Sequence, residues 1–138
     1  MALTPTKFIP NEMKTSIVKI YAYDNNNLIG TLYNPYLKVE KKFLSTFNLL
    51  NLIEQTMDDM DYPQAINECR TFVDNKENKE ELSIEELKEK EILATFNIKV
   101  LFRQNATWQG SIVWVEDNTV SQFRSVYELL VLMDSVLK

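Results

Sequence analysis

The chain contains the same unit twice. Residues 18–58 align without a gap on residues 98–138, at a constant offset of 80 positions. Eight of these 41 positions are identical, and the only two glycines of the chain fall on each other. The identical pairs are Lys19/Lys99, Asn25/Asn105, Gly30/Gly110, Phe43/Phe123, Ser45/Ser125, Leu49/Leu129, Leu50/Leu130 and Leu52/Leu132. A chain of 138 residues with this pattern folds as one ordinary domain or as two small halves that share a core.

Each unit opens with a pattern typical of a β-hairpin. Apolar residues recur at every second position, which indicates a strand, and a polar turn rich in asparagine follows. The residues expected on the apolar face are Val18, Ile20 and Ala22 in the first copy and Ile98, Val100 and Phe102 in the second. A second strand is predicted over 28–34 and 108–115, and a short third strand over 39–43 and 119–123.

Gly30 and Gly110 lie inside the predicted second strand of each unit. Glycine weakens a strand unless the strand bends or another backbone approaches it closely. We therefore predict a bulge or a close packing contact at both glycines.

A helix closes each unit. Ser125 and Glu128 have the spacing of a capping box, and Ser45 holds the same cap position with Asn48 in place of the glutamate. The apolar stripe that follows is wider than a surface helix needs, so we expect each helix to contact the other unit as well.

These patterns predict an α+β fold in which tandem β-β-β-α repeats form one pseudo-twofold domain, with antiparallel strands and helices packed on one side. The first repeat, with a lead-in and a trailing segment, covers residues 1–73. A charged connector covers 74–91, and the second repeat covers 92–138. The connector holds eight acidic residues and four lysines, which give it a net charge of −4. The net charge of the whole chain is −5. The repeats themselves are therefore nearly neutral. Within the connector, Ser83 and Glu86 resemble another capping box, which predicts a short solvated helix over 84–93.

Composition argues against several kinds of chemistry. The chain has no histidine, which removes the commonest general base and metal ligand. Its single cysteine, Cys69, has no second thiol for a disulfide or a zinc site, and two glycines cannot build a phosphate-binding loop. Asp58, Asp59 and Asp61 lack the pattern of a calcium loop. We therefore expect no enzyme activity, no metal site and no cofactor.

The start of the chain has no basic region followed by an apolar core, and the apolar runs are far shorter than the ~20 residues that a membrane span needs. We therefore expect a cytoplasmic protein without membrane contact, as a monomer or a homodimer.

One candidate binding surface emerges on the predicted strand face opposite the core. It combines tyrosines that can stack on unpaired bases with cations that can neutralise phosphates. Its residues are Lys19, Tyr21, Tyr23, Tyr33, Lys99 and Arg103. The alternative is an ordinary exposed strand face, because tyrosine favours strands by propensity alone. Trp108 and Trp114 share the face of Ile112, so we interpret them as core residues rather than ligand-stacking ones.

The sequence carries two resemblances. Ala94–Ile112, Phe123–Ser125 and Glu128–Leu130 resemble segments of small two-repeat proteins from low-GC Gram-positive bacteria, a likeness that implies no named function. The doubled unit of three strands and a helix is similar in layout to PUR repeats and Whirly domains, which implies binding of single-stranded nucleic acid.

Three functional hypotheses follow. The first is a non-catalytic, regulatory interaction protein that binds a macromolecular partner. The second is a single-stranded nucleic-acid-binding protein that uses the tyrosine and lysine face. The third is an inhibitor carried by a mobile element, such as an anti-CRISPR-like protein or a nucleic-acid mimic, whose acidic connector makes the contact.

Overall fold

The computed structural model describes residues 14–60, 90–104 and 107–138. In chain order its elements are β1 (Ser16–Asp24), β2 (Asn27–Asn34), β3 (Val39–Phe43), α2 (Thr46–Met60), β4 (Ala94–Gln104), β5 (Thr107–Trp114), the short 3-10 helix η1 (Val115–Asp117), β6 (Thr119–Phe123) and α4 (Val126–Leu137). Residues 74–89 of the connector and Cys69 lie outside the described residues. The described end of the predicted short helix, residues 90–93, is not helical.

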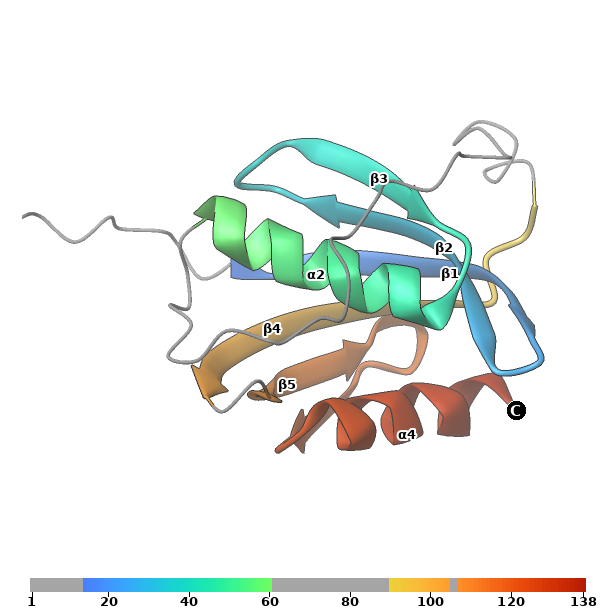
Figure 1. Cartoon of the computed structure of the whole chain (residues 1–138). Helices are drawn as coiled ribbons and strands as arrows, with labels where there is room; N and C mark the ends of the chain where they lie inside the picture. The colour runs from blue at the N-terminus through green and yellow to red at the C-terminus, as the bar shows by residue number, and fades with distance from the viewer. Residues whose placement is uncertain (1–13, 61–89, 105–106) are drawn as a thin grey trace, which may run out of the picture.

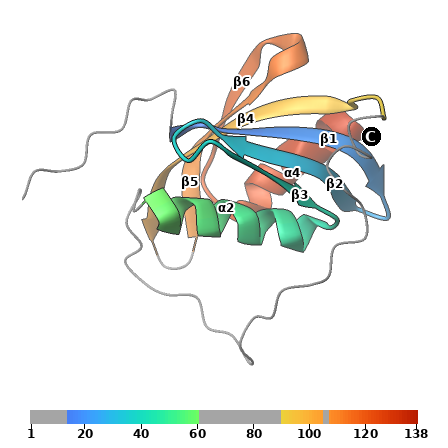
Figure 2. The same cartoon turned by 90° about the horizontal axis from the view of Figure 1, so that it is seen from above.

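The six described strands form one antiparallel sheet with the order β3-β2-β1-β4-β5-β6. Figure 1 labels β3, β2, β1, β4 and β5 in this order, and Figure 2 labels β6. The predicted α+β class is therefore confirmed: the described residues form a six-stranded antiparallel sheet and the helices α2 and α4. β1 and β4 occupy the centre, and β3 and β6 form the two edges.

The strand register repeats at an offset of 80 residues. All seven residue pairs between β1 and β2 have counterparts between β4 and β5, and all five pairs between β2 and β3 have counterparts between β5 and β6. In the central pair of strands, Ile17 of β1 lies opposite Asn97 of β4, and these two residues are themselves 80 positions apart.

Both helices lie on the same face of the sheet. Residues directly opposite each other in paired strands share a face, so the register defines a row across the sheet. This row consists of Lys41, Leu32, Val18, Phe96, Trp114 and Thr119. Its β2 end faces α2, and its β5 and β6 end faces α4. The view from above in Figure 2 shows α2 lying along one side of the strands.

Between the helices and this face lies one hydrophobic core to which both halves contribute. Fully buried side chains in the first half include Phe43 and Leu49, and their counterparts Phe123 and Leu129 are equally buried. Trp108 also belongs to this core, and Trp114 packs against it, as the sequence predicted.

The predicted helix caps are confirmed. The Ser45 hydroxyl accepts a hydrogen bond from the Asn48 amide at 3.0 Å, while the Asn48 side chain accepts one from the Leu44 amide at 3.1 Å. In α4 the Ser125 hydroxyl accepts from the Glu128 amide at 3.1 Å. These bonds satisfy amides that the first turn of a helix leaves without a partner.

Close backbone contact at the two glycines is confirmed as well. A Cβ atom on Gly30 would overlap the carbonyl oxygen of Lys19, and one on Gly110 would overlap that of Lys99. The bulge lies on the neighbouring strand in each case. The register shifts between Ile20 and Ala22 in β1, and at the equivalent place in β4.

Candidate interaction face of the sheet

The two bulges decide which side chains reach each face of the sheet. A bulge inserts one residue, so the alternation of side chains reverses beyond it. Tyr21 and Leu101 are the inserted residues. Beyond them, Tyr23 pairs with Leu28, and Arg103 pairs with Trp108, so both point to the helix side.

The residues of the predicted binding surface therefore do not all share one face of the sheet. Lys19, Tyr33 and Lys99 lie on the face opposite the helices, as expected. Tyr23 and Arg103 lie on the helix side, and Tyr21 is a buried bulge residue. The cause is the inserted residue, because the sequence interpretation assumed uninterrupted alternation along each strand.

We call the side of the sheet opposite α2 and α4 the helix-free face. One row crosses all six strands on it and consists of Glu40, Tyr33, Ile17, Asn97, Val113 and Val120. A second row places Lys19 and Lys42 on either side of Thr31. Within the described ranges no helix packs on this face.

The helix-free face differs between its two halves. In the first half Thr31 and Lys42 are buried. In the second half large apolar side chains reach solvent: Phe102 is 55% exposed and Val120 is 65% exposed.

The pairing assigns Phe102 to this face because it lies opposite Gln109, the neighbour of the buried Trp108. The sequence interpretation had assigned Phe102 to the apolar face that packs on the core, and the bulge reverses that assignment as well. The face thus combines cations with exposed aromatic and aliphatic groups, a composition found at binding surfaces.

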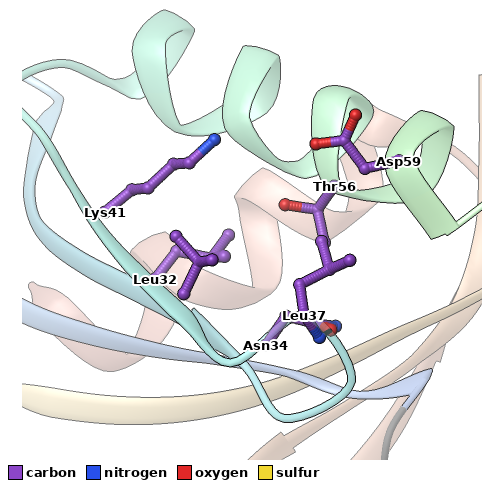
Figure 3. A pocket seen from close by; sticks show the side chains of 7 residues that line it. Leu32, Asn34, Leu37, Lys41, Thr56 and Asp59 are labelled. Atoms are coloured by element: carbon purple, nitrogen blue, oxygen red, sulfur yellow. Dashed lines mark hydrogen bonds between the residues drawn. The ribbon is translucent and has the colours of Figure 1, made fainter.

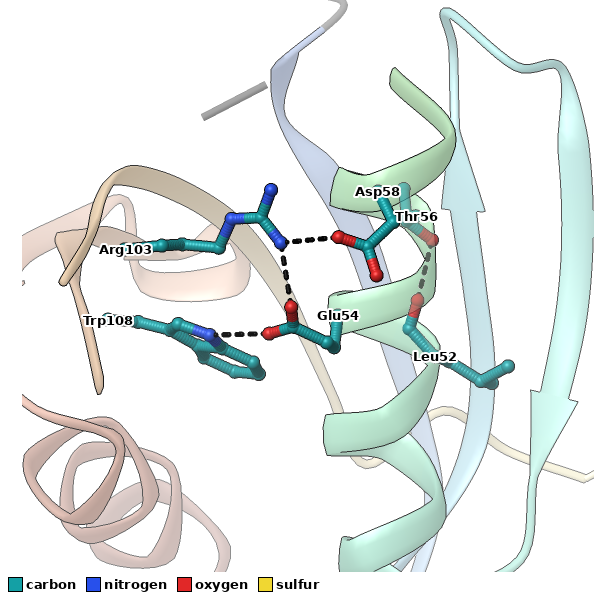
Figure 4. A network of polar contacts seen from close by, with 6 residues as sticks. All are labelled: Leu52, Glu54, Thr56, Asp58, Arg103 and Trp108. Carbon is teal, nitrogen blue, oxygen red and sulfur yellow. Dashed lines mark hydrogen bonds and ion pairs between the residues drawn. The ribbon is translucent and has the colours of Figure 1, made fainter. Parts of the chain in front are cut away.

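Arg103 has a structural role on the helix side. Its side chain is only 4% exposed, and its guanidinium donates to Glu54 at 2.7 Å and to Asp58 at 2.8 Å (Figure 4). The indole of Trp108 donates to the other oxygen of Glu54 at 3.0 Å. These bonds connect the end of the β4–β5 hairpin to α2.

The equivalent place in the other half holds a matching contact. Tyr23 corresponds to Arg103, and its hydroxyl donates to Asp134 of α4, which corresponds to Glu54. Asp134 also pairs with Lys138 at 3.1 Å. The hydrogen bond from Tyr23, supported by Lys138, lowers the pKa of Asp134, and the same bond raises the pKa of Tyr23. Each helix therefore contacts the hairpin of the other half, as the width of its apolar stripe predicted.

Two clefts lie at equivalent places between an edge strand and its helix. The β3 cleft has a volume of about 220 Å³ and is lined by Leu32, Asn34, Leu37, Val39, Lys41, Thr56 and Asp59 (Figure 3). The β6 cleft has a volume of about 180 Å³ and is lined by Phe96, Ile112, Trp114, Thr119, Ser121, Leu132, Ser135 and Val136. The first carries opposite charges on Lys41 and Asp59, whereas the second is mainly apolar.

Two further observations concern the described part of the chain. None of its helices combines the length and apolar character that crossing a membrane requires. Residues 14–60, 90–104 and 107–138 contain no group of three carboxylate or thiol side chains that could hold a metal ion.

No protein-family model matches the chain, and neither a curated protein nor a solved structure does. The likeness in layout to PUR repeats and Whirly domains therefore remains a resemblance in sequence pattern.

Proposed function

We propose that the protein is a non-catalytic, regulatory interaction protein that acts in the cytoplasm and binds a macromolecular partner through the helix-free face. The observation that carries the proposal is the exposure of Phe102 on a sheet face that no described helix covers. An exposed aromatic side chain on a rigid strand loses little entropy on binding and buries a large area, which makes it a suitable anchor for a partner.

A substitution at Phe102 tests this role. Phe102→Asp removes the proposed anchor from the helix-free face, and Tyr127→Asp is its matched control, because Tyr127 is 77% exposed on α4 and lies away from that face. When recovered from cells of the source organism, the wild type and the control should each carry a bound partner. The Phe102→Asp variant should be recovered without it. Equal recovery with all three proteins would overturn the proposal. So would turnover of a nucleotide, peptide or phosphoester that a point mutation abolishes.

Single-stranded nucleic acid is the second candidate partner. Lys19, Lys99, Tyr33 and Phe102 share the helix-free face, which supplies two cations and two aromatic rings for phosphates and bases. Fluorescence anisotropy with short DNA and RNA oligomers at two salt concentrations tests this candidate. Micromolar affinity that falls steeply with salt, and falls again in Lys19→Ala/Lys99→Ala, is the expected result.

The third candidate, inhibition through the acidic connector, is tested by deletion of residues 75–90. Loss of an inhibitory activity would support the connector as the contact. Retention of that activity would assign the contact to residues outside the deleted segment.

We further propose that the two halves are copies of one β-β-β-α unit related by a pseudo-twofold axis at Ile17 and Asn97. The repeated register, the paired bulges and the matched contacts between hairpin and helix all support this duplication. Under this proposal, the β3 cleft, with Lys41 and Asp59 in its lining, and the uncharged β6 cleft are equivalent places that have diverged.

A further inference from the structure

The two edges of the sheet differ in how they resist pairing with another strand. β3 carries three consecutive charged residues, Glu40, Lys41 and Lys42, which is a common protection of an exposed edge. β6 has the sequence Thr-Val-Ser-Gln-Phe and carries no charge at all. No described strand pairs with its outer side.

The surroundings of β6 also favour an added strand. The apolar β6 cleft lies beside it on the helix side, where the equivalent β3 cleft has Lys41 and Asp59. On the helix-free side Val120 is 65% exposed. A strand added along β6 would therefore cover apolar surface on both faces of the sheet.

Charge indicates which strand fits. Exposed acidic residues, Glu116 and Asp117, come just before β6, and exposed Arg124 comes just after it. In an antiparallel pair of two identical strands, the acidic end of each lies beside the basic end of the other. A second copy of this chain is thus complementary to β6 at both ends.

We propose that the protein forms a symmetric homodimer by antiparallel pairing of β6 with β6 of a second copy. The pairing joins two six-stranded sheets into one continuous sheet. It would bring Arg124 of each copy next to the acidic end at Glu116 and Asp117 of the other. The twofold axis must lie between one residue of β6 and the same residue of the second copy. An axis between two successive residues would place opposed residues on different faces of the sheet.

Charge reversal at the strand ends tests the proposal. Arg124→Asp leaves acidic groups at both ends of β6, so sedimentation equilibrium should show dimerisation roughly tenfold weaker than in the wild type. The double variant Asp117→Arg/Arg124→Asp should recover part of the lost affinity. Arg124, two residues before α4, also pairs with Glu128 in the first turn of that helix, at 3.1 Å. The double variant does not restore that pair, so recovery separates the dimer contact from an effect on the helix.

Matched substitutions on the two edges identify the paired strand. Val120→Lys should abolish the dimer, whereas Val39→Lys on the β3 edge should leave it intact. Circular dichroism confirms that each variant is folded. A wild-type protein that stays monomeric up to millimolar concentration would overturn the proposal. It would also be overturned if Val39→Lys weakened association as much as Val120→Lys, because that result indicates β3–β6 pairing into open filaments.

Discussion

At the scale of single residues, the two glycines explain how neighbouring strands come into contact at the bulges. Gly30 lies opposite Ile20 and Gly110 opposite Val100, immediately before the inserted residue of β1 and of β4. The missing side chain leaves room for the carbonyl group of the adjacent strand. Conformational freedom is not the reason, since neither glycine has a positive φ.

Alanine at either glycine should therefore destabilise the fold strongly. Gly30→Ala and Gly110→Ala each place a methyl group against backbone atoms that cannot rotate away, and we expect a loss of about 3 kcal/mol in the free energy of unfolding. Urea denaturation monitored by circular dichroism measures this loss. A loss below about 0.5 kcal/mol would show that the strands can separate without penalty.

The buried guanidinium of Arg103 predicts an unequal contribution from its two carboxylate partners among the described residues, Glu54 and Asp58. Glu54→Ala leaves the Trp108 indole without its acceptor and Arg103 without one of its two carboxylates, so a loss of about 2 kcal/mol is expected. Asp58→Ala should change stability by less than about 1 kcal/mol, because Asp58 is more exposed and Glu54 remains. The comparison uses the same urea measurement, and equal effects would contradict this assignment.

At the scale of elements, contacts between each hairpin and the helix of the other half hold the two halves together. One contact joins the β4–β5 hairpin to α2, and the other joins the β1–β2 hairpin to α4. The first relies on a buried cation with two carboxylates. The second relies on a phenol that donates to a carboxylate, and its strength therefore depends on pH.

The contribution of the Tyr23–Asp134 bond should fade at both extremes of pH. Asp134 has a pKa below its ordinary 3.8, so its stabilising effect is present above that value and is lost as pH falls through the pKa of the folded state. Tyr23 has a pKa above its ordinary 10.0, so its effect is lost as pH rises beyond 10.0. The stability difference between the wild type and Tyr23→Phe should therefore be largest between these limits and shrink outside them.

Thermal unfolding of both proteins across that pH range measures the difference. Tyr127→Phe is the control, because its ring is exposed on α4. A difference that does not change with pH would show that Tyr23 acts through packing alone.

At the scale of the whole molecule, both halves contribute to one core, so the chain should unfold as one unit. Leu49 and Leu129 are completely buried at equivalent positions. Leu49→Ala and Leu129→Ala should each lower the free energy of unfolding by about 3 kcal/mol and shift one single transition. Calorimetry distinguishes this outcome from two separate transitions, which would indicate independently folding halves.

The local structure of this protein could be predicted from short stretches of its sequence. Alternating apolar residues and the serine caps depend on neighbours within a few positions, and so the third strands over 39–43 and 119–123 agree with β3 and β6. The requirement for glycine at 30 and 110 could also be inferred, because few other causes place glycine inside a strand. The width of the apolar stripe on each helix further indicated that both helices would contact the other half.

Which side chains share a surface depends on strand pairing, which short stretches of sequence do not specify. One inserted residue per hairpin reverses every side chain beyond it, and this moved Tyr23 and Arg103 from the expected binding face into contacts with the helices. It also left Phe102 exposed on the helix-free face. The central pairing of β1 with β4, which leaves β3 and β6 as edges, involves residues about 80 positions apart. Such pairing depends on the packing of the whole core and not on local sequence.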